Sequence, residues 1–434
     1  MLPSTGAGVV VVGASVAGLH AAEALRDADY AGPVTVLDAD QEPSCDRPPL
    51  SKQLLAGVWT REQTQLRDAD ALAGRGIDVR HGVRAVGLDI QSSTLDTSAG
   101  PLRYDGLVVA TGATARDLPG AGTRPGLYTL RTQADCLALR RDLEDGAALV
   151  VVGAGFIGME VAATARSLGA EVTVVDPLEA PMQGVLGRDA GRALQRLHAE
   201  HGVGFRLGRG VRVVHGASRV GAVELDDESV VRADAVLVGI GARPAAGWLA
   251  GAGLDVSAGL ACDRYLAAAP HVVGAGDVVD WFNPRYGRRM RVEHWTNAAQ
   301  QGAIAARNLL VARVDRNPAD LVPYFWSDQY DVRIQFSGVA GSDVRVLPLG
   351  SATRPERRVV LSGQDGVLTS VLAVGVDQAF VRARRMLRRR TPMDEAEATV
   401  RTLLDGIEPR TAESTDPVPA HPSAPRRAGS STGP

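Results

Sequence analysis

The stretch VVVVGASVAGLHAAEAL at residues 9–25 decides the fold of this chain, and LVVVGAGFIGMEVAATA at residues 149–165 repeats its pattern. In both, a run of valines predicts a buried strand, a glycine-rich turn follows, and a helix of small residues begins. The key turn positions are held by Gly13, Ser15 and Gly18 in the first stretch and by Gly153, Gly155 and Gly158 in the second. The repeat predicts two similar strand–turn–helix units.

Turns of this kind bind the pyrophosphate of a dinucleotide. Glycine is needed because a side chain would keep the backbone N–H groups at the helix N-terminus away from the anion. One such turn is weak evidence, but two in one chain indicate two dinucleotides, one staying bound and one exchanging. This is the arrangement of an enzyme whose flavin is reduced by a nicotinamide.

Size and charge narrow the class of protein. A chain of 434 residues predicts two or three domains, and a net charge of −3 gives no reason to expect nucleic-acid binding. No apolar run is long enough to span a membrane. The N-terminus, MLPSTGAG, has no basic region ahead of an apolar stretch, so we expect a cytoplasmic location.

The cysteines exclude two kinds of site. Cys45, Cys136 and Cys262 lie far apart and form neither a CxxC nor a CxxxxC pair. We therefore expect no metal site and no redox-active disulfide.

The chain has a single lysine, Lys52, among 47 lysines and arginines. One interpretation is a compositional bias toward arginine that left this lysine behind. The other is that this position requires a compact ammonium group, which differs chemically from a planar guanidinium. The motif around Lys52, described below, favours the second interpretation.

Acidic residues end the second strand of each unit. The strand VTVLD ends at Asp38, 20 residues after Gly18, where a carboxylate can bind an adenosine ribose, and Asp40 is the alternative. In the other unit VTVVD ends at Asp176, with no arginine in the next three residues to hold a 2′-phosphate. Because a carboxylate accepts hydrogen bonds from a ribose 2′-hydroxyl and repels a 2′-phosphate, we expect NADH rather than NADPH.

Five further motifs occur in order, and together they point to one family. They are RPPLSK at 47–52, ATG at 110–112, GAGD at 274–277, EHWTNA at 293–298 and FWSDQY at 325–330. Over residues 7–400 the sequence resembles the FAD-dependent ferredoxin reductases of bacterial oxygenase systems. The resemblance implies an α/β fold with two Rossmann-like domains in a glutathione-reductase-like arrangement, and a small α+β C-terminal domain.

The same resemblance implies how the domains follow one another. The FAD domain would be built from two segments, with the NAD domain inserted between them. The expected limits are 1–112 for the first FAD segment, 113–241 for the NAD domain, 242–320 for the second FAD segment, 321–407 for the C-terminal domain and 408–434 for a disordered tail.

Matching the family motifs position by position gives the expected cofactor contacts. For FAD they are Gly13, Ala17, Gly18, Arg47, Lys52, Val83, Ala110, Thr111, Gly112, Arg131, Asp277, which would bind the ribityl chain, and Trp295. For NAD they are Gly153, Gly155, Ile157, Gly158, Glu160 and Gly241, and Trp326 matches an aromatic residue implicated in ferredoxin docking. The sequence departs from the family at Ser15, which replaces the middle glycine, and at Cys45.

The expected chemistry is hydride transfer from nicotinamide C4 to flavin N5. Lys52 near N5 would favour negative charge on the reduced ring, and an ion pair with Glu160 would hold the lysine in place. The alternative for Glu160 is that it is simply stable near a helix N-terminus.

The expected electron acceptor is an iron–sulfur ferredoxin that takes electrons one at a time and supplies a cytochrome P450 or a Rieske dioxygenase. Trp295 and Trp326 are candidates for the rim where it docks. An acidic ferredoxin would be attracted by Arg285, Arg288, Arg289, Arg382, Arg384, Arg385, Arg388, Arg389 and Arg390. The alternative for the C-terminal arginines is a solvated basic helix end.

Two other functions are considered. Cys45 would be the redox centre of a single-cysteine NADH oxidase or peroxidase. The arginine-rich helix and the tail would suit a flavin-binding interaction protein similar to apoptosis-inducing factor.

Overall fold

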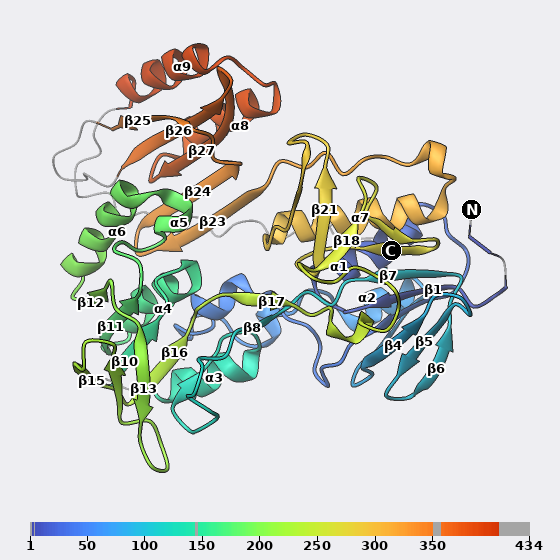
Figure 1. Ribbon diagram of the computed structural model, residues 1–434, viewed down its shortest axis with the longest axis horizontal. Coiled ribbons are helices and arrows are strands. Elements are labelled where there is room, and N and C mark those ends of the chain that lie inside the picture. Colours follow the sequence, from blue (N-terminus) through green and yellow to red (C-terminus); the bar gives the residue numbers. More distant parts are fainter. Residues whose placement is uncertain (1, 4, 144–145, 350–356, 408–434) are drawn as a thin grey trace, which may run out of the picture.

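The computed structural model describes residues 2–3, 5–143, 146–349 and 357–407. The predicted disordered tail, 408–434, lies outside the described residues. Three regions can be distinguished: one built around the first glycine-rich turn, one around the second, and the C-terminal sheet, which lies above the second region in the view of Figure 1.

The first region is a six-stranded sheet with strand β1 (Val9–Val12) inside it. All four valines of β1 are buried, and the strand pairs in parallel with a neighbour on each side. The sheet has the order β19 (Ala267–Ala269), β20 (Val272–Gly274), β7 (Gly106–Val109), β1, β2 (Val34–Leu37) and β3 (Ile77–Arg80). A strand buried on both faces is typical of parallel α/β sheets, which explains the unbroken valine run.

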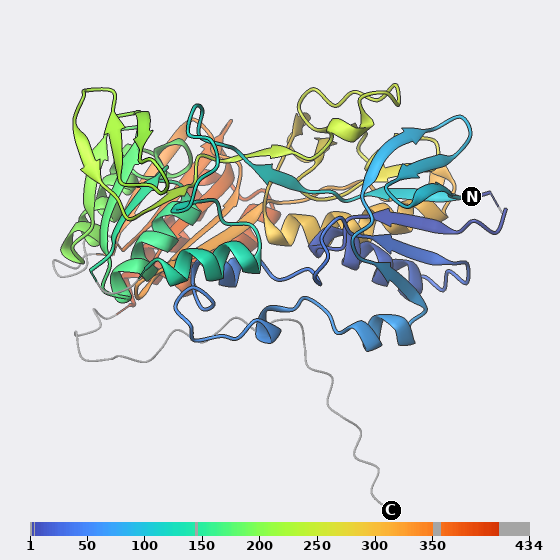
Figure 2. The same cartoon turned by 90° about the horizontal axis from the view of Figure 1, so that it is seen from below.

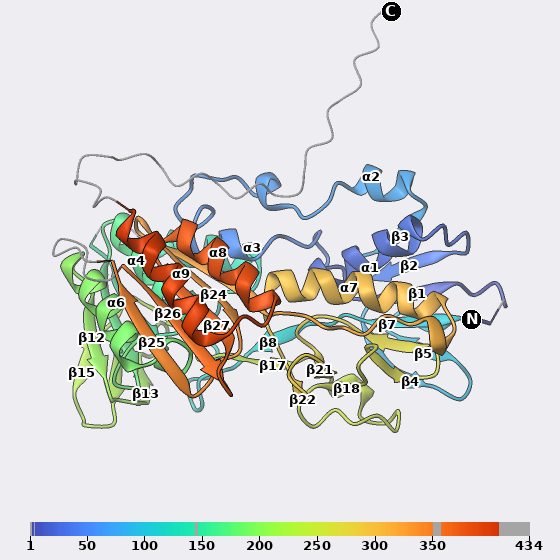
Figure 3. The ribbon, with the colours of Figure 1, turned by 90° about the horizontal axis from the view of Figure 1, so that it is seen from above.

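Two helices distant in sequence pack together in this region. Helix α1 (Val16–Asp27) lies along α7 (Trp295–Leu310), as Figure 3 shows. A Cβ atom at Gly302 would lie 2.2 Å from the carbonyl oxygen of Ala17, so the glycine is what allows the two backbones to approach so closely. This contact brings the chain beyond residue 290 back to the first glycine-rich turn.

The second region repeats the first. Its five-stranded sheet has the order β12 (Gly204–Leu207), β11 (Glu171–Asp176), β10 (Ala148–Val152), β16 (Ala235–Val238) and β9 (Leu127–Tyr128), and all of these pairs are parallel. The helices of this region are α3 (Gln133–Arg141), α4 (Phe156–Ser167), α5 (Gln183–Leu186) and α6 (Arg188–Glu200). Helix α4 follows the second glycine-rich turn as α1 follows the first.

Each of these regions also carries a three-stranded antiparallel meander. The first is β4 (Ala85–Asp89), β5 (Thr94–Thr97) and β6 (Gly100–Arg103), and the second is β13 (Val211–His215), β14 (Ala222–Leu225) and β15 (Val230–Arg232). The chain crosses between the regions in β8 (Ala113–Ala115) and returns in β17 (Ala242–Pro244), and these strands pair with each other, as Figure 2 shows. The first region also holds α2 (Ala69–Gly74) and the small sheet β18 (Leu260–Cys262), β21 (Val279–Asn283) and β22 (Arg288–Met290).

The C-terminal region is an antiparallel sheet covered on one face by two helices. The strands run in the order β23 (Tyr324–Gln329), β24 (Val332–Gly338), β27 (Val367–Val374), β26 (Arg358–Gln364) and β25 (Asp343–Pro348), and the helices are α8 (Asp377–Arg388) and α9 (Met393–Asp405). Phe325 and Ile334 belong instead to the hydrophobic core of the second region. The sheet is therefore fixed between its own helices and α4.

Within the described part of the chain, no helix combines the length and the apolar character needed to cross a membrane.

Candidate active site

The first glycine-rich turn opens into a cavity of about 720 Å³. Gly13 has φ +110°, and a Cβ atom there would lie 2.3 Å from the carbonyl oxygen of Ala110. A Cβ atom at Gly18 would lie 1.8 Å from the carbonyl oxygen of Gly13. These glycines bring α1 close to β1 and β7 and leave the N-terminus of α1 facing the cavity, which suits an anion.

The structure places nearly all of the predicted FAD contacts around this cavity. The lining residues that the sequence predicted are Gly13, Ser15, Ala17, Asp38, Arg47, Lys52, Val83, Ala110, Thr111, Gly112, Arg131, Asp277, Trp295 and Trp326. Gly18 does not line the cavity and acts in packing α1. Ile157 and Glu160, predicted for NAD, also line it, so the cavity extends to the start of α4.

Opposite charges gather in the cavity wall. Burial, reinforced by nearby Arg47, lowers the pKa of Arg131 to about 10. Burial raises the pKa of Asp277, although both arginines oppose that shift. Arg47 and Arg131 both line the cavity and repel each other, and a bound pyrophosphate would compensate that repulsion. His294 also lines the cavity, and its buried Nδ1 has no hydrogen-bond partner.

The two candidate ribose ligands differ in burial. Asp38 is buried at the end of β2, where its Oδ2 accepts a hydrogen bond of 2.8 Å from the Ser44 hydroxyl. Asp40 is exposed, although both residues line the cavity. The position of Asp38, held in place at the carboxyl end of a parallel strand, is the one expected of a ribose ligand.

The second glycine-rich turn has the same backbone geometry. Gly153 has φ +105°, and a Cβ atom there would lie 2.4 Å from the Gly239 carbonyl oxygen. A Cβ atom at Gly158 would lie 2.1 Å from the Gly153 carbonyl oxygen, whereas one at Gly155 would meet nothing within 4 Å. Asp176 ends β11 and accepts a hydrogen bond of 2.7 Å from the Ala154 amide, so its carboxylate lies beside the turn.

Gly241 ends the loop after β16 with φ +98°, and its carbonyl oxygen accepts a hydrogen bond from the Arg116 amide. It therefore lies where the paired strands β8 and β17 join the two regions. It does not line the cavity at the first turn.

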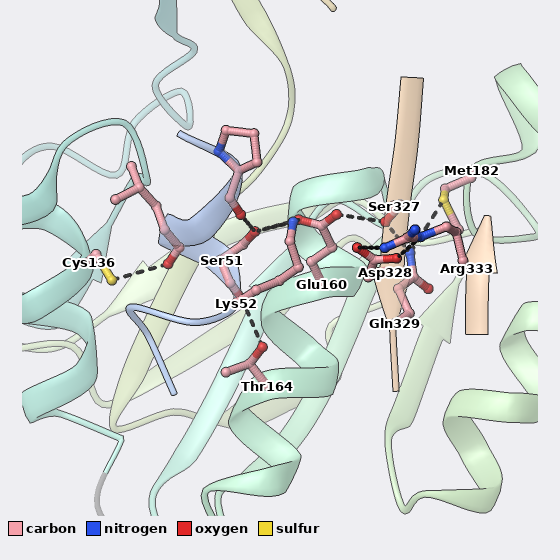
Figure 4. Close-up of polar contacts among 12 residues, drawn as sticks. Ser51, Lys52, Cys136, Glu160, Thr164, Met182, Ser327, Asp328, Gln329 and Arg333 are labelled. Atoms are coloured by element: carbon pink, nitrogen blue, oxygen red, sulfur yellow. Dashed lines mark hydrogen bonds and ion pairs between the residues drawn. The ribbon is translucent and has the colours of Figure 1, made fainter. Parts of the chain in front are cut away.

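The predicted ion pair between the single lysine and Glu160 is present. Lys52 Nζ lies 2.7 Å from Glu160 Oε2, and the two side chains are only 14% and 7% exposed. The Ser51 hydroxyl donates to the same oxygen, and the Ser51 carbonyl accepts a hydrogen bond of 2.8 Å from Thr164 (Figure 4). These hydrogen bonds hold the short 3₁₀ helix Pro48–Ser51 against α4. Lys52 is therefore fixed by its own ion pair with Glu160 and by the anchoring of Ser51, the residue before it.

The C-terminal strand β23 completes this part of the site. The Ser327 hydroxyl donates a hydrogen bond of 2.7 Å to Glu160 Oε1. The Phe325 ring lies 4.4 Å from that of Phe156 and 4.9 Å from that of His294, measured between ring centroids. Burial lowers the pKa of His294 to about 4, so this ring is neutral at neutral pH.

A second hollow, a groove of about 1080 Å³, lies on the other side of β23. Its walls come from the segment after Asp46, the start of α7, β23 and α8, and include Arg384, Arg385 and Arg388. Trp295 and Trp326 line both hollows, as do Pro48 and Lys52. These residues form the partition between the cavity and the groove, which we call the tryptophan wall.

The other predicted arginines do not line this groove. Arg285 pairs with Asp320, and Arg289 pairs with Asp280. Arg390 donates to the Arg285 carbonyl oxygen, so the two predicted clusters adjoin. Arg288, Arg382 and Arg389 are exposed.

None of the three cysteines lines the cavity at the first glycine-rich turn. Burial raises the pKa of the Cys45 thiol. Cys136 donates to the Leu50 carbonyl oxygen, and burial raises its pKa to about 12. Among the described residues, no group of three or more His, Cys, Asp or Glu side chains could hold a metal ion.

Sequence reasoning missed several residues of the site. They are Ser51, Phe156, His294, Phe325, Ser327 and Gln329. Ser51, His294, Phe325, Ser327 and Gln329 stand inside the recognised motifs RPPLSK, EHWTNA and FWSDQY, and the alternation of FWSDQ was the available signal. It predicts two faces for the strand, with Phe325, Ser327 and Gln329 on one and Trp326 and Asp328 on the other.

Comparison with known proteins agrees with this geometry. Residues 7–302 match the family described as pyridine nucleotide-disulphide oxidoreductase, and residues 324–402 match the reductase C-terminal domain. The ferredoxin–NAD(+) reductase component of the anthranilate 1,2-dioxygenase system of Burkholderia cepacia is 38% identical over 87% of this chain and 93% of its own length.

A second relative and a solved structure are both putidaredoxin reductases. Putidaredoxin reductase of Pseudomonas putida is 33% identical, over 89% of this chain and 93% of its own length. The crystal structure of the covalent putidaredoxin reductase–putidaredoxin complex matches with a TM-score of 0.85 and 28% identity, covering 92% of this chain and 99% of that one. The chain belongs to the pyridine nucleotide-disulphide oxidoreductases and, among them, to the ferredoxin–NAD(+) reductases of oxygenase systems.

Proposed function

We propose that this protein transfers electrons from NADH through FAD to an iron–sulfur ferredoxin, which supplies a cytochrome P450 or a Rieske dioxygenase. The observation that carries the proposal is the spatial arrangement of the start of α4, the cavity and the tryptophan wall. The cavity at the first glycine-rich turn lies between the start of α4 and the tryptophan wall. A cofactor there can receive hydride on one side and lose electrons through the other.

The residues around the cavity fit FAD. Gly13, Ala17 and the N-terminus of α1 would hold the pyrophosphate together with Arg47 and Arg131, and Asp38 would bind the adenosine ribose. Asp277 would bind the ribityl chain. The remaining contacts would come from Ser15, Val83, Ala110, Thr111, Gly112 and Trp295. When bound, FAD supplies a hydride acceptor that can give up its two electrons one at a time.

Residues of the second glycine-rich turn would hold the nicotinamide nucleotide. The N-terminus of α4, with Gly153, Gly155 and Gly158, would hold the pyrophosphate, and Asp176 would accept a hydrogen bond from the ribose hydroxyl and reject a 2′-phosphate. Ile157 and Glu160 would contact the nicotinamide half, and Gly241 would lie beneath it. The Lys52 ammonium, held by Glu160, would stabilise the negative charge that accumulates when hydride arrives.

The groove beside the tryptophan wall would receive the ferredoxin. Arg384 lies over the Tyr324 ring at 4.0 Å from its centroid, which keeps its guanidinium at the groove. Arg385 and Arg388 are exposed beside it. The arginines of this groove, with the adjoining exposed Arg382, Arg389 and Arg288, would attract an acidic partner.

Salt and charge reversal test the docking site. The double variant Arg385→Glu/Arg388→Glu should lower kcat/KM for ferredoxin about tenfold at low salt and flatten its salt dependence, because steering depends on charge. NADH-to-ferricyanide turnover of the unchanged enzyme should vary little with salt. The matched control is Arg103→Glu, an exposed arginine of the distant strand β6. An equal loss in both variants would contradict docking at the groove.

We place this reaction in the cytoplasm, because NADH and three unpaired cysteines suit a reducing compartment. We also propose that the domain limits are those predicted from the sequence, with the changes between FAD and NAD segments at strands β8 and β17.

A further inference from the structure

A buried chain of hydrogen bonds leads away from Glu160 through the C-terminal strand β23. Ser327 donates to Glu160 Oε1 over 2.7 Å, and Gln329 Nε2 donates to Ser327 Oγ over 3.1 Å. Gln329 Oε1 lies 2.9 Å from Nε2 of His198, on α6. Figure 4 shows Glu160 on α4 facing Ser327 of β23, with Gln329 further along the same strand. Ser327, Gln329 and His198 are all fully buried, so water cannot replace these contacts.

The Glu160 carboxylate, at one end of this series of hydrogen bonds, fixes the direction of each of them. Ser327 has one hydroxyl hydrogen, and a carboxylate can only accept, so Ser327 must in turn accept from the Gln329 amide. Gln329 Oε1 then faces His198, so Nε2 of that ring carries the hydrogen. Its Nδ1 is left to accept from the Tyr330 hydroxyl at 3.4 Å. Burial lowers the pKa of His198 to about 4, which agrees with a neutral ring in this one tautomer.

All the donors therefore point toward one carboxylate. Hydrogen bonds arranged in this way polarise one another and strengthen together. Glu160 Oε2 takes Lys52 and Ser51, which come from the first region, and Oε1 takes Ser327, from the C-terminal region. With Ser327 removed, the carboxylate could rotate about its last torsion and carry the lysine ammonium with it.

The strand that supplies Ser327 is itself firmly placed. Phe325 packs against Phe156 of α4 and against Phe336 of the neighbouring strand. Gln329 continues the same face toward α6. The position of the serine is thus set by contacts that do not depend on Lys52.

We propose that Ser327 is a positioning residue for hydride transfer, which orients Glu160 and through it Lys52, and that Gln329 and His198 hold the serine hydroxyl in the required direction. The proposal rests on the proposed role of the Lys52–Glu160 pair. It gives the C-terminal region a part in the reductive half of the reaction, in addition to the docking groove on the opposite face of β23.

The test begins with Ser327→Ala in the full-length, FAD-loaded enzyme. The limiting rate constant of flavin reduction at saturating NADH, measured by stopped-flow absorbance, should fall about tenfold to a hundredfold, since small displacements of reacting groups have effects of this size. The NADH concentration at half saturation should change less than about twofold, because the serine does not face the nucleotide turn. Ser327→Thr, which keeps the hydroxyl, should recover most of the rate.

The matched control is Ser337→Ala. Ser337 is a buried serine on the neighbouring strand β24, and its hydroxyl donates to the Pro323 carbonyl oxygen over 2.9 Å. This variant loses a buried hydroxyl from the same sheet, but one that is not bonded to Glu160. Its flavin reduction rate should therefore stay within about twofold of that of the unchanged enzyme. An equal fall in this control would overturn the proposal, because it would trace the effect to general loosening of the sheet.

A double-mutant cycle separates positioning from a structural role. In a Glu160→Gln background, Ser327→Ala should lower the reduction rate by no more than about twofold, because its target is already lost. If Ser327→Ala lowered the reduction rate by the same factor with and without the Glu160 carboxylate, the proposal would be overturned. If Glu160→Gln alone left the rate unchanged, the role of the Lys52–Glu160 pair itself would fail, and the proposal with it.

Gln329→Leu provides a second variant if Ser327→Ala does not hold FAD. It leaves Ser327 in place and removes the donor that orients it, so the reduction rate should fall about threefold to tenfold, less than for direct loss of the serine. An unchanged rate in the FAD-loaded variant would overturn the part assigned to Gln329 and His198.

Discussion

The two glycine-rich turns have the same backbone but different surroundings. Gly13 and Gly153 have φ angles of +110° and +105°, and each lies close to a carbonyl oxygen beyond a neighbouring strand. Gly18 and Gly158 both pack against the carbonyl of the first glycine in their own turn. Equal sequence patterns have therefore produced equal geometry, and the difference between the two sites must arise elsewhere.

The difference comes from what the rest of the chain places in front of each turn. The first turn shares its cavity with Arg131, with Asp277 and with the start of α7, which the contact between α1 and α7 brings back to it. At the second turn Gly155 has open space in front of it, and Ile157 is 42% exposed. An enclosed turn suits a cofactor that stays, and an open turn suits one that exchanges. We therefore expect segments distant in sequence, and not the turns themselves, to decide which nucleotide is retained.

The largest expected effect comes from placing a methyl group at the last motif glycine of each turn, Gly18 in the first and Gly158 in the second. Gly18→Ala and Gly158→Ala would each press a Cβ atom into a backbone carbonyl, at 1.8 and 2.1 Å, so the helix must shift at a cost of about 1–3 kcal/mol. Gly18→Ala should purify with little flavin absorbance per polypeptide. Gly158→Ala should remain yellow, but kcat/KM for NADH with ferricyanide should fall about tenfold to a hundredfold.

Gly74→Ala serves as the control for this pair, because a Cβ atom at that helical glycine would meet nothing within 4 Å. It should keep both its FAD and its NADH activity. The reverse result, in which Gly158→Ala loses FAD and Gly18→Ala keeps it, would contradict the assignment of FAD to the first turn and of NADH to the second.

A smaller effect is expected from the acids that end the second strands. Asp176→Asn keeps an acceptor for the Ala154 amide but removes the charge that repels a 2′-phosphate. Losing a charged hydrogen-bond partner costs about 1.5–3 kcal/mol, so the preference for NADH over NADPH in kcat/KM should narrow by about tenfold to a hundredfold.

Asp38→Asn is the matched change at the first turn. It should weaken retention of FAD, measured as flavin released on dilution, and leave the preference for NADH unaltered. If Asp176→Asn left the ratio of the two nucleotides where it was, the proposed ribose contact at the second turn would be wrong.

Much of this organisation follows from local sequence. Valine runs and glycine-rich turns each depend on neighbours in the chain, and they predicted the two strand–turn–helix units correctly. The family motifs then led to Lys52 and Glu160, and the structure brings these two side chains into contact.

What the sequence did not show depends on how separate elements dock. The pattern of β23 indicates two faces, but only the packing of the C-terminal sheet against α4 shows that Ser327 meets Glu160. Gln329 and His198 are 131 residues apart and share no motif. The arginines of α8 likewise follow helical spacing, which does not say that only Arg384, Arg385 and Arg388 line the groove.

The smallest expected effect comes from exchanging the middle residues of the two turns. Ser15 has φ −88° and Gly155 has φ −77°, both extended conformations that any residue adopts, and a Cβ atom at Gly155 meets no protein atom. The middle position therefore serves the ligand and not the fold. Ser15→Gly should change the Kd for FAD by no more than about threefold, and Gly155→Ser should raise the KM for NADH by less than about tenfold. The free energy of unfolding should change by less than about 1 kcal/mol in both variants. If Gly155→Ser instead unfolded the protein, this position would be packed more tightly in the second turn than in the first, where Ser15 stands, and openness would no longer explain why the nucleotide of the second turn exchanges.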